Sequence, residues 1–277
     1  LIVSDSRPSS ASVPGRYEVL RDAGVTAFGV DVTMLNNPRD IHESVLRAAS
    51  SGTGVIPCIT RIASSVTGNT MNPVITDFDY NKKLEKRIIA IVDTLRNISP
   101  LAFSLGRDNM LTPFDIDVSF SETDIESFTN YLRDKYETIE ALNSAWHTNY
   151  ISFDKVSPVK LADAVRTNSY AAWLDTRLHM EEVFTQVHYG AFDAFNSAKS
   201  TALVGIDGFG DALNPFRGFN LFELTGFLTM VVSDQEAGAG FPGDRSVSAI
   251  LSSFMQPGSL SGLSLTGDRY RRRAPAL

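Results

Sequence analysis

Short apolar runs alternate with longer amphipathic stretches along most of the chain. The short runs are rich in Val, Ile and Leu, end in polar residues and have the length of buried strands. They lie at residues 1–3, 25–32, 55–59, 101–105, 203–206, 229–232 and 260–265. The longer stretches predict helices at residues 14–23, 41–52, 79–97, 124–136, 139–146, 169–198, 221–228 and 245–255. The segment 64–76 follows neither pattern and is predicted to be a long loop.

Strands that alternate with helices at this rhythm predict parallel βαβ units. A doubly wound sheet and a (β/α) barrel both fit the pattern. Polar residues just past the strand ends favour the barrel, because the carboxyl ends of barrel strands converge on one face. These residues are Ser4, Asp5, Asp31, Arg61, Asp108, Asp207 and Asp234. No GxGxxG motif follows the first strand, which argues against a dinucleotide-binding sheet.

We therefore predict an α/β protein with the (β/α)8 TIM-barrel fold, in one domain over residues 1–277. A helical insertion is expected after the fourth strand, at about 113–198. Seven strands can be identified, so the last βα unit is expected beyond Leu277. The barrel is thus predicted to be incomplete at its C-terminus.

Composition narrows the class of protein. With 43% hydrophobic and 21% charged residues, the chain is typical of a globular protein. One cysteine, Cys58, excludes an internal disulfide and a thiolate zinc cluster. The net charge of −7 argues against a nucleic-acid partner, and no apolar run is long enough to predict a membrane span. The basic run at 269–273 is interpreted as a solvated helix start.

The ends of the sequence carry a separate hint. The chain opens on Leu1 without an initiator Met or the features of a signal peptide, and it stops at Leu277 in what reads as the middle of an element. We expect a segment of a longer protein, and the compartment cannot be read from it.

The polar residues at the strand ends have two interpretations. Paired carboxylates with arginines and aromatic rings are the chemistry of a sugar site. Alternatively, each Asp caps the following helix or shapes a turn. Other chemistries find less support: the four histidines lack metal-ligand spacing, no GxSxG elbow is present, and the glycine-rich stretch 205–210 has no Lys. The two-carboxylate chemistry of a sugar site requires no metal or organic cofactor, and none is expected.

One block of sequence is recognisable. The segment 124–158, with the core YLRDKYETIEALNSAW at 131–146, resembles family 42 glycoside hydrolases. Weaker likenesses lie at 103–112, 204–208, 218–220, 253–254 and 262–270. The resemblance implies a β-galactosidase-like member of the retaining (β/α)8 clan. For some relatives it also implies trimers, so a homo-oligomer is an open expectation.

The same resemblance implies catalytic residues, with departures from the family pattern. Asp108 falls where the family has the acid/base Glu, and Arg107 stands beside it where an acid or Asn is usual. The family takes its nucleophile from a Glu near the seventh strand, but 259–268 contains none. Glu236 and Asp268 are the remaining candidates, and the other alternative is a nucleophile that lies beyond Leu277 or is absent. The shorter Asp108 side chain and an adjacent guanidinium both weaken the case for general-acid function.

The predicted function is hydrolysis of a glycosidic bond, of β-galactoside type, with net retention. Carbohydrate is the expected partner, with no nucleic acid and no membrane. Its hydroxyls would be held by the residues Arg7, Asp31, Arg61, Arg107, Asn109 and Asp207. The alternative is a catalytically impaired barrel that binds carbohydrate or serves as a structural module of a larger protein. A lyase barrel ranks last, because no Lys lies at a predicted strand end.

Overall fold

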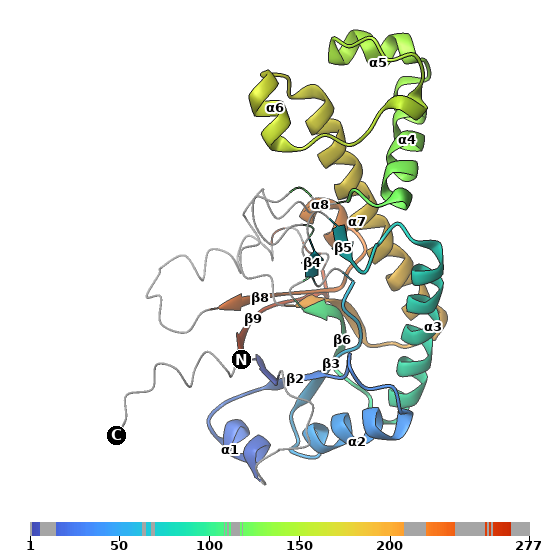
Figure 1. Cartoon of the computed structure of the whole chain (residues 1–277). Helices are drawn as coiled ribbons and strands as arrows, with labels where there is room; N and C mark the ends of the chain where they lie inside the picture. Colours follow the sequence, from blue (N-terminus) through green and yellow to red (C-terminus); the bar gives the residue numbers. More distant parts are fainter. Residues whose placement is uncertain are drawn as a thin grey trace.

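The computed structural model describes most of the chain. The described residues are 2–5, 15–62, 65–67, 70–107, 109, 111, 117, 119–207, 220–235, 253, 255 and 257–266. Within them, seven parallel strands form a closed ring in the order β1-β2-β3-β6-β7-β8-β9 (Figure 1). The strands are β1 (Ile2–Asp5), β2 (Ala27–Asp31), β3 (Gly54–Cys58), β6 (Ala102–Arg107), β7 (Leu203–Asp207), β8 (Met230–Gln235) and β9 (Leu260–Thr266). The predicted α/β class and parallel arrangement are therefore confirmed.

The ring closes directly between its first and last strands. Ile2 is paired with Ser264, and Ser4 with Thr266, in parallel register. The (β/α)8 pattern would place an eighth strand between them, but the described ring closes with seven. The structure thus agrees with a TIM-barrel architecture that lacks one strand.

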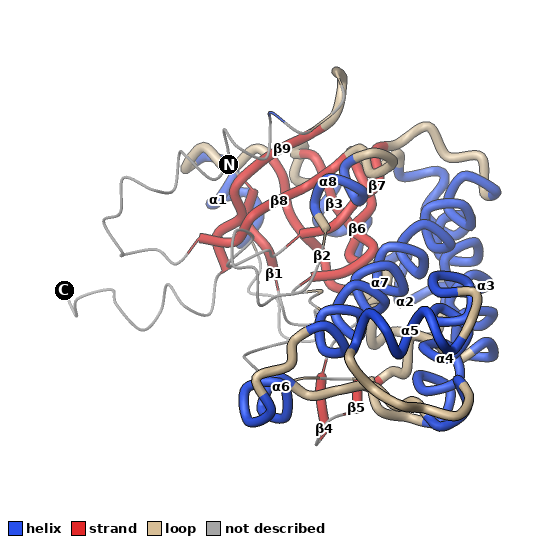
Figure 2. The backbone as a smooth tube through the Cα atoms, turned by 90° about the horizontal axis from the view of Figure 1, so that it is seen from above, coloured by secondary structure: helices blue, strands red, loops and turns tan. Residues whose placement is uncertain are grey.

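Helices surround the ring and extend beyond it. They are α1 (Arg16–Asp22), α2 (Pro38–Ala49), α3 (Phe78–Leu95), α4 (Glu122–Tyr136), α5 (Ile139–Trp146), α6 (Leu161–Thr167), α7 (Ala171–Ser197) and α8 (Leu221–Thr225). Two 3-10 turns cover Arg96–Ile98 and Phe153–Lys155. The helices α4, α5, α6 and the first half of α7 project away from the ring; we call them the helical extension (Figures 1 and 2).

Most helix starts follow from local sequence. Asp77 caps α3 by accepting a hydrogen bond from the Tyr80 amide at 2.7 Å. The helix α4 begins with a capping box, in which the Ser121 side chain accepts from the Asp124 amide and the Asp124 side chain accepts from the Ser121 amide. The segment predicted as a loop at 64–76 differs: β4 (Ser65–Thr67) and β5 (Thr70–Asn72) form an antiparallel pair. Such short strands escape periodicity because three residues show too little alternation.

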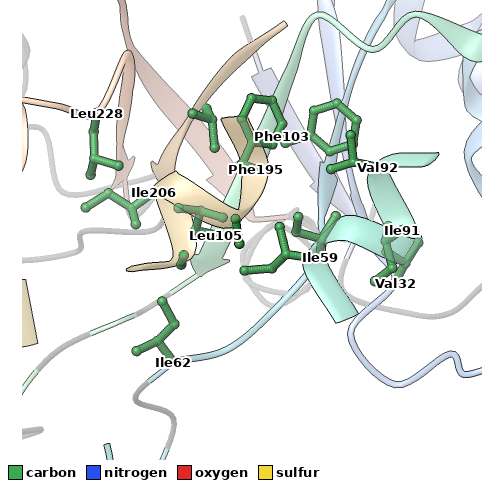
Figure 3. Packing of buried hydrophobic residues seen from close by; sticks show 14 of the residues in the cluster. Val32, Ile59, Ile62, Ile91, Val92, Phe103, Leu105, Phe195, Ile206 and Leu228 are labelled. Carbon is green, nitrogen blue, oxygen red and sulfur yellow. The ribbon is translucent and has the colours of Figure 1, made fainter. Parts of the chain in front are cut away.

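Alternation along the strands separates two apolar cores. The side chains on the outer face of the strands pack against the helices. There Phe103, Leu105 and Ile206 meet Phe195 of α7 and Val92 of α3 (Figure 3). The alternate side chains along each strand face the inside of the ring. Its apolar layer consists of Ile2, Ala27, Ile56, Ala102, Met230 and Val232. Because side chains two residues apart share a face, Asp31, Ser104 and Asp207 lie on the same inward face, nearer the carboxyl ends of their strands.

Candidate functional site

The carboxyl ends of β2 and β7 bring two predicted aspartates to the inside of the ring. Asp31 lies four residues past the buried Ala27, and Asp207 four residues past Leu203, so both share the inward parity. Asp31 is 9% exposed and Asp207 4%. A buried carboxylate is stable only when charges or donors compensate it, and each of these has such partners.

Asp207 is held by the neighbouring strand. Its Oδ1 accepts a hydrogen bond from Ser104 Oγ at 2.7 Å. Its Oδ2 accepts from Arg107 Nη2 at 3.1 Å and Nε at 3.4 Å, and both side chains of this ion pair are under a tenth exposed. Such a desolvated, charge-assisted pair fixes the geometry of both partners.

Arg107 reaches Asp207 because β6 carries a bulge. Ser104 lies opposite Gly205 and Arg107 opposite Asp207, so two residues of β6 stand against one of β7. The extra residue reverses the alternation and places Arg107 on the inward face beside Ser104. Gly106 makes the bulge at φ +152°, a conformation that side chains disfavour. Gly205 is needed for a different reason: a Cβ there would lie 1.7 Å from the carbonyl oxygen of Met230.

Asp31 forms the second pair, with Arg61 from the segment after β3. Its Oδ2 accepts from Arg61 Nη2 at 2.7 Å, and its Oδ1 accepts from the Thr33 amide at 2.9 Å and hydroxyl at 2.6 Å. The Arg61 side chain is 44% exposed, unlike the buried Arg107. Arg61 therefore offers an accessible guanidinium that is anchored on a buried carboxylate.

A half-buried arginine, Arg87, fixes the loop that follows Asp31. Arg87 Nη2, from α3, donates to the carbonyls of Val32, Thr33 and Leu35 at 3.1, 2.8 and 3.1 Å. Three carbonyls held by one guanidinium give this loop a defined path. The position of Asp31 is thus fixed by β2, which carries it, and by Arg87 of α3, which holds the loop that follows it.

The single cysteine lies between the two pairs. Cys58 ends β3 and is 1% exposed. Burial raises the pKa of its thiol, and the negative charges of Asp207 and Asp31 raise it further. In the ring, β3 lies between β2, which carries Asp31, and β6, which is followed by β7 with Asp207, so these side chains line the same end of the ring. We call Asp31, Arg61, Cys58, Arg107 and Asp207 the mouth residues.

Asn109 has a different environment. It is 2% exposed, and its Nδ2 lies 3.0 Å from Nε2 of His188 on α7 and donates to the Leu105 carbonyl at 3.3 Å. These contacts place its amide between β6 and α7. Burial lowers the pKa of His188 to about 4, so this ring is neutral near pH 7. The expected contact of Asn109 with sugar hydroxyls stays a prediction.

Four predicted site residues, Arg7, Asp108, Glu236 and Asp268, lie outside the described residues. The structure adds Ser104, Thr33 and His188, which the sequence did not reveal. Ser104 could have been found from strand alternation, since it lies two residues past the inward-facing Ala102. The roles of Thr33 and His188 depend on turn geometry and helix packing, which leave no local motif.

The described part of the chain offers no metal centre. Within it, no group of three His, Cys, Asp or Glu side chains has the arrangement of a metal site. No helix in that part is long and apolar enough to cross a membrane.

Solved structures of known proteins share the fold of this chain. The catalytic domain of a β-amylase from Paenibacillus polymyxa superimposes with a TM-score of 0.71 at 13% identity, over 95% of this chain and 91% of that one. A β-galactosidase from Bacillus circulans sp. alkalophilus gives a TM-score of 0.71 at 12% identity, over 91% of this chain. This chain spans 42% of that enzyme. No family model matches.

One curated relative matches locally. A thermophilic β-amylase from Thermoanaerobacterium thermosulfurigenes is 43% identical over 51 residues, which is 18% of this chain and 9% of that protein. The chain thus has the α/β barrel architecture seen in glycoside hydrolases. At these identities the structural likeness concerns the fold.

Proposed function

We propose that this chain is the barrel of a glycoside hydrolase that cleaves a glycosidic bond at the mouth of the ring. The observation that carries the proposal is the pair of buried carboxylates, Asp31 and Asp207, at the carboxyl ends of strands in a glycosidase-type barrel. Active sites of such barrels are built at that face. The polar, hydrogen-bonded mouth suits a ligand rich in hydroxyl groups.

Asp31 and Asp207 are assigned to binding. Both oxygens of each already accept hydrogen bonds, as ionised carboxylates do. An oxygen with two lone pairs can also accept from a sugar hydroxyl. Arg61, with its exposed donors, is the complementary partner for the sugar oxygens.

The bond-breaking residues are proposed from the sequence. Asp108 is the acid/base candidate, and Glu236 or Asp268 the nucleophile, in a retaining mechanism of two carboxylates. The family 42 resemblance makes a β-galactoside the first candidate substrate, and the fold likeness to a β-galactosidase supports it. The local identity to a β-amylase favours an amylose-type glucan as the second.

Hydrolysis assays decide between these substrates. The chain is incubated with an aryl β-galactoside and with a maltooligosaccharide, beside Asp108→Ala and the control Asp163→Ala. Asp163 is an exposed carboxylate on α6, far along the sequence from the strand ends. Turnover of one substrate that falls to background in Asp108→Ala and persists in the control supports the proposal.

The first-formed anomer, read by NMR, tests the mechanism. A retained configuration corresponds to carboxylates about 5 Å apart, and inversion to a gap of roughly 6.5–9.5 Å. No turnover of either substrate by the unmodified chain would reject hydrolysis. Measurable binding of the free sugars would then favour the carbohydrate-binding alternative.

A further inference from the structure

The end of β6 is held from both of its faces. On the inner face Arg107 is paired with Asp207, and on the outer face Asn109 contacts His188. Asp108, the proposed acid/base, lies between these two residues in sequence and outside the described part of the chain. The structure therefore defines how the two neighbours of Asp108 are held.

The hydrogen bonds of His188 fix the orientation of the Asn109 amide. Nδ1 of His188 lies 2.7 Å from the carbonyl oxygen of Phe184, which can only accept, so Nδ1 carries the proton. A neutral ring then has only a lone pair at Nε2. The group that faces Nε2 at 3.0 Å must be the Asn109 NH2, whose second hydrogen goes to the Leu105 carbonyl.

This orientation has a cost that packing alone does not explain. The Asn109 Oδ1 is buried and has no hydrogen-bond partner among the described residues. An unpaired buried acceptor keeps the desolvation penalty of burial without a compensating hydrogen bond. The amide also lies so close to the strand that a Cβ at residue 106 would be 2.3 Å from Oδ1. Glycine at 106 thus serves both the bulge and the approach of Asn109.

We propose that His188 is a positioning residue for the reaction: through Asn109 it holds the outer face of the β6 end, opposite the Arg107–Asp207 pair. The inference rests on the proposed function. The hydrogen bonds of the His188 ring go to Asn109 and Phe184, so it acts from a helix outside the ring of strands. Its effect belongs to the chemical step, because small displacements of a reacting group lower the rate more than they weaken binding.

The test compares variants in the full chain, with the substrate that the hydrolysis assays identify. His188→Phe keeps the ring volume and removes the acceptor, and His188→Gln retains one. Asn109→Leu breaks the same contact from the strand side. The matched control is His179→Phe, the same substitution in the same helix. His179 is also buried and loses one hydrogen bond, to Ser127 at 2.9 Å.

We expect kcat to fall about tenfold or more in His188→Phe and in Asn109→Leu, with KM within about twofold. Glutamine at 188 should restore most of kcat, and the double variant should lose no more than either single one. The control should keep the kcat of the unmodified chain. If His188→Phe fails to fold, Asn109→Leu and His188→Gln carry the test.

Two results would overturn the inference. One is an active chain whose kcat is as high in Asn109→Leu and His188→Phe as in the control. The other is a loss confined to KM, which would assign Asn109 to substrate binding. An inactive unmodified chain is a separate result: it rejects the proposed function, and a catalytic positioning role for His188 with it.

Discussion

Asp207 in the mouth of the ring and Asp175 in the helical extension are both buried aspartates that accept three hydrogen bonds. In the mouth, Asp207 accepts from Ser104 and twice from Arg107, all on the adjacent strand. In the extension, Asp175 of α7 accepts from Lys135 Nζ at 2.6 Å, Tyr136 hydroxyl at 2.6 Å and Trp146 Nε1 at 2.9 Å. The chemistry is nearly the same, but the donors come from different places.

The origin of the donors separates a structural role from a functional one. Asp175 joins α7 to α4 and α5, so it stabilises the contact between three helices that otherwise share a small core. That core consists of Phe128, Leu132, Leu142, Trp146 and Val156. Asp207 joins two strands that the ring already holds in register. Its ion pair is not needed to bring the strands together, which agrees with the proposal that Asp207 binds substrate.

The largest effect we expect follows from breaking the inner pair. Arg107→Met leaves Asp207 as a buried charge without its guanidinium, which typically costs about 3–5 kcal/mol. Urea unfolding should show this loss of stability. The single cysteine provides a second measurement, because Cys58 is buried and its raised thiol pKa keeps it unreactive. Alkylation of Cys58 in native conditions should therefore accelerate in this variant.

Arg61→Met is the matched control at the other pair. Its guanidinium is nearly half exposed, so solvent screens the ion pair and its loss should cost about 1 kcal/mol or less. Equal destabilisation by the two substitutions would contradict the difference in burial that distinguishes the pairs.

The extension should respond to its own aspartate with a smaller and more local effect. Asp175→Asn removes the charge that Lys135 and Tyr136 share, and hydrogen bonds to a charged group contribute about 1.5–3 kcal/mol. Hydrogen exchange should increase in α4 and α5 while the ring strands keep their protection. Asp154→Asn, at an exposed ion pair with Arg133 in the same region, should leave exchange unchanged. Increased exchange throughout the ring would show that the two regions unfold as one unit.

Much of the ring could be predicted because its strands are buried and its helices amphipathic. All seven strands follow from the apolar runs, and position alone places Asp31 and Asp207 at their carboxyl ends. The boundaries shift where tertiary contacts extend an element: β6 continues to Arg107, two residues beyond the apolar run. That extension contains the bulge, which depends on pairing with β7 rather than on local preference.

The arrangement inside the mouth could not be predicted either, because it also depends on contacts between residues that are distant in the sequence. The sequence suggests that Arg107 contacts sugar, and its partner Asp207 is 100 residues away in the sequence. No spacing rule connects them. The hydrogen bonds of Asp175 escape sequence analysis because its donors lie on two other helices.

Acid titration compares the helical extension with the outer face of the β6 end, because each has one buried histidine. His188 borders β6, and His179 is packed between Phe128 and Tyr131 in the extension. Burial lowers the pKa of both to about 4 in the folded chain, against 6.5 for a free imidazole. The unfolded chain therefore takes up protons that the folded chain refuses as the pH falls from about 6.5 toward 4, and stability present at pH 7 is lost over that range. Each histidine should account for about 2 kcal/mol between pH 7 and 5.

The measurement is the urea midpoint at pH 7 and pH 5 for the unmodified chain, His179→Phe and His188→Phe. Each substitution should remove its own share of the pH dependence, whatever it does to stability at pH 7. His147, which is exposed, supplies the control, since His147→Asn should leave the slope unchanged. A slope that survives both phenylalanine variants would mean that other groups drive the acid response. If His179→Phe alone removes the pH dependence of stability, His188 takes up its proton in the folded chain. The Asn109 amide must then turn over, so that its Oδ1 accepts a hydrogen bond from the protonated His188 ring.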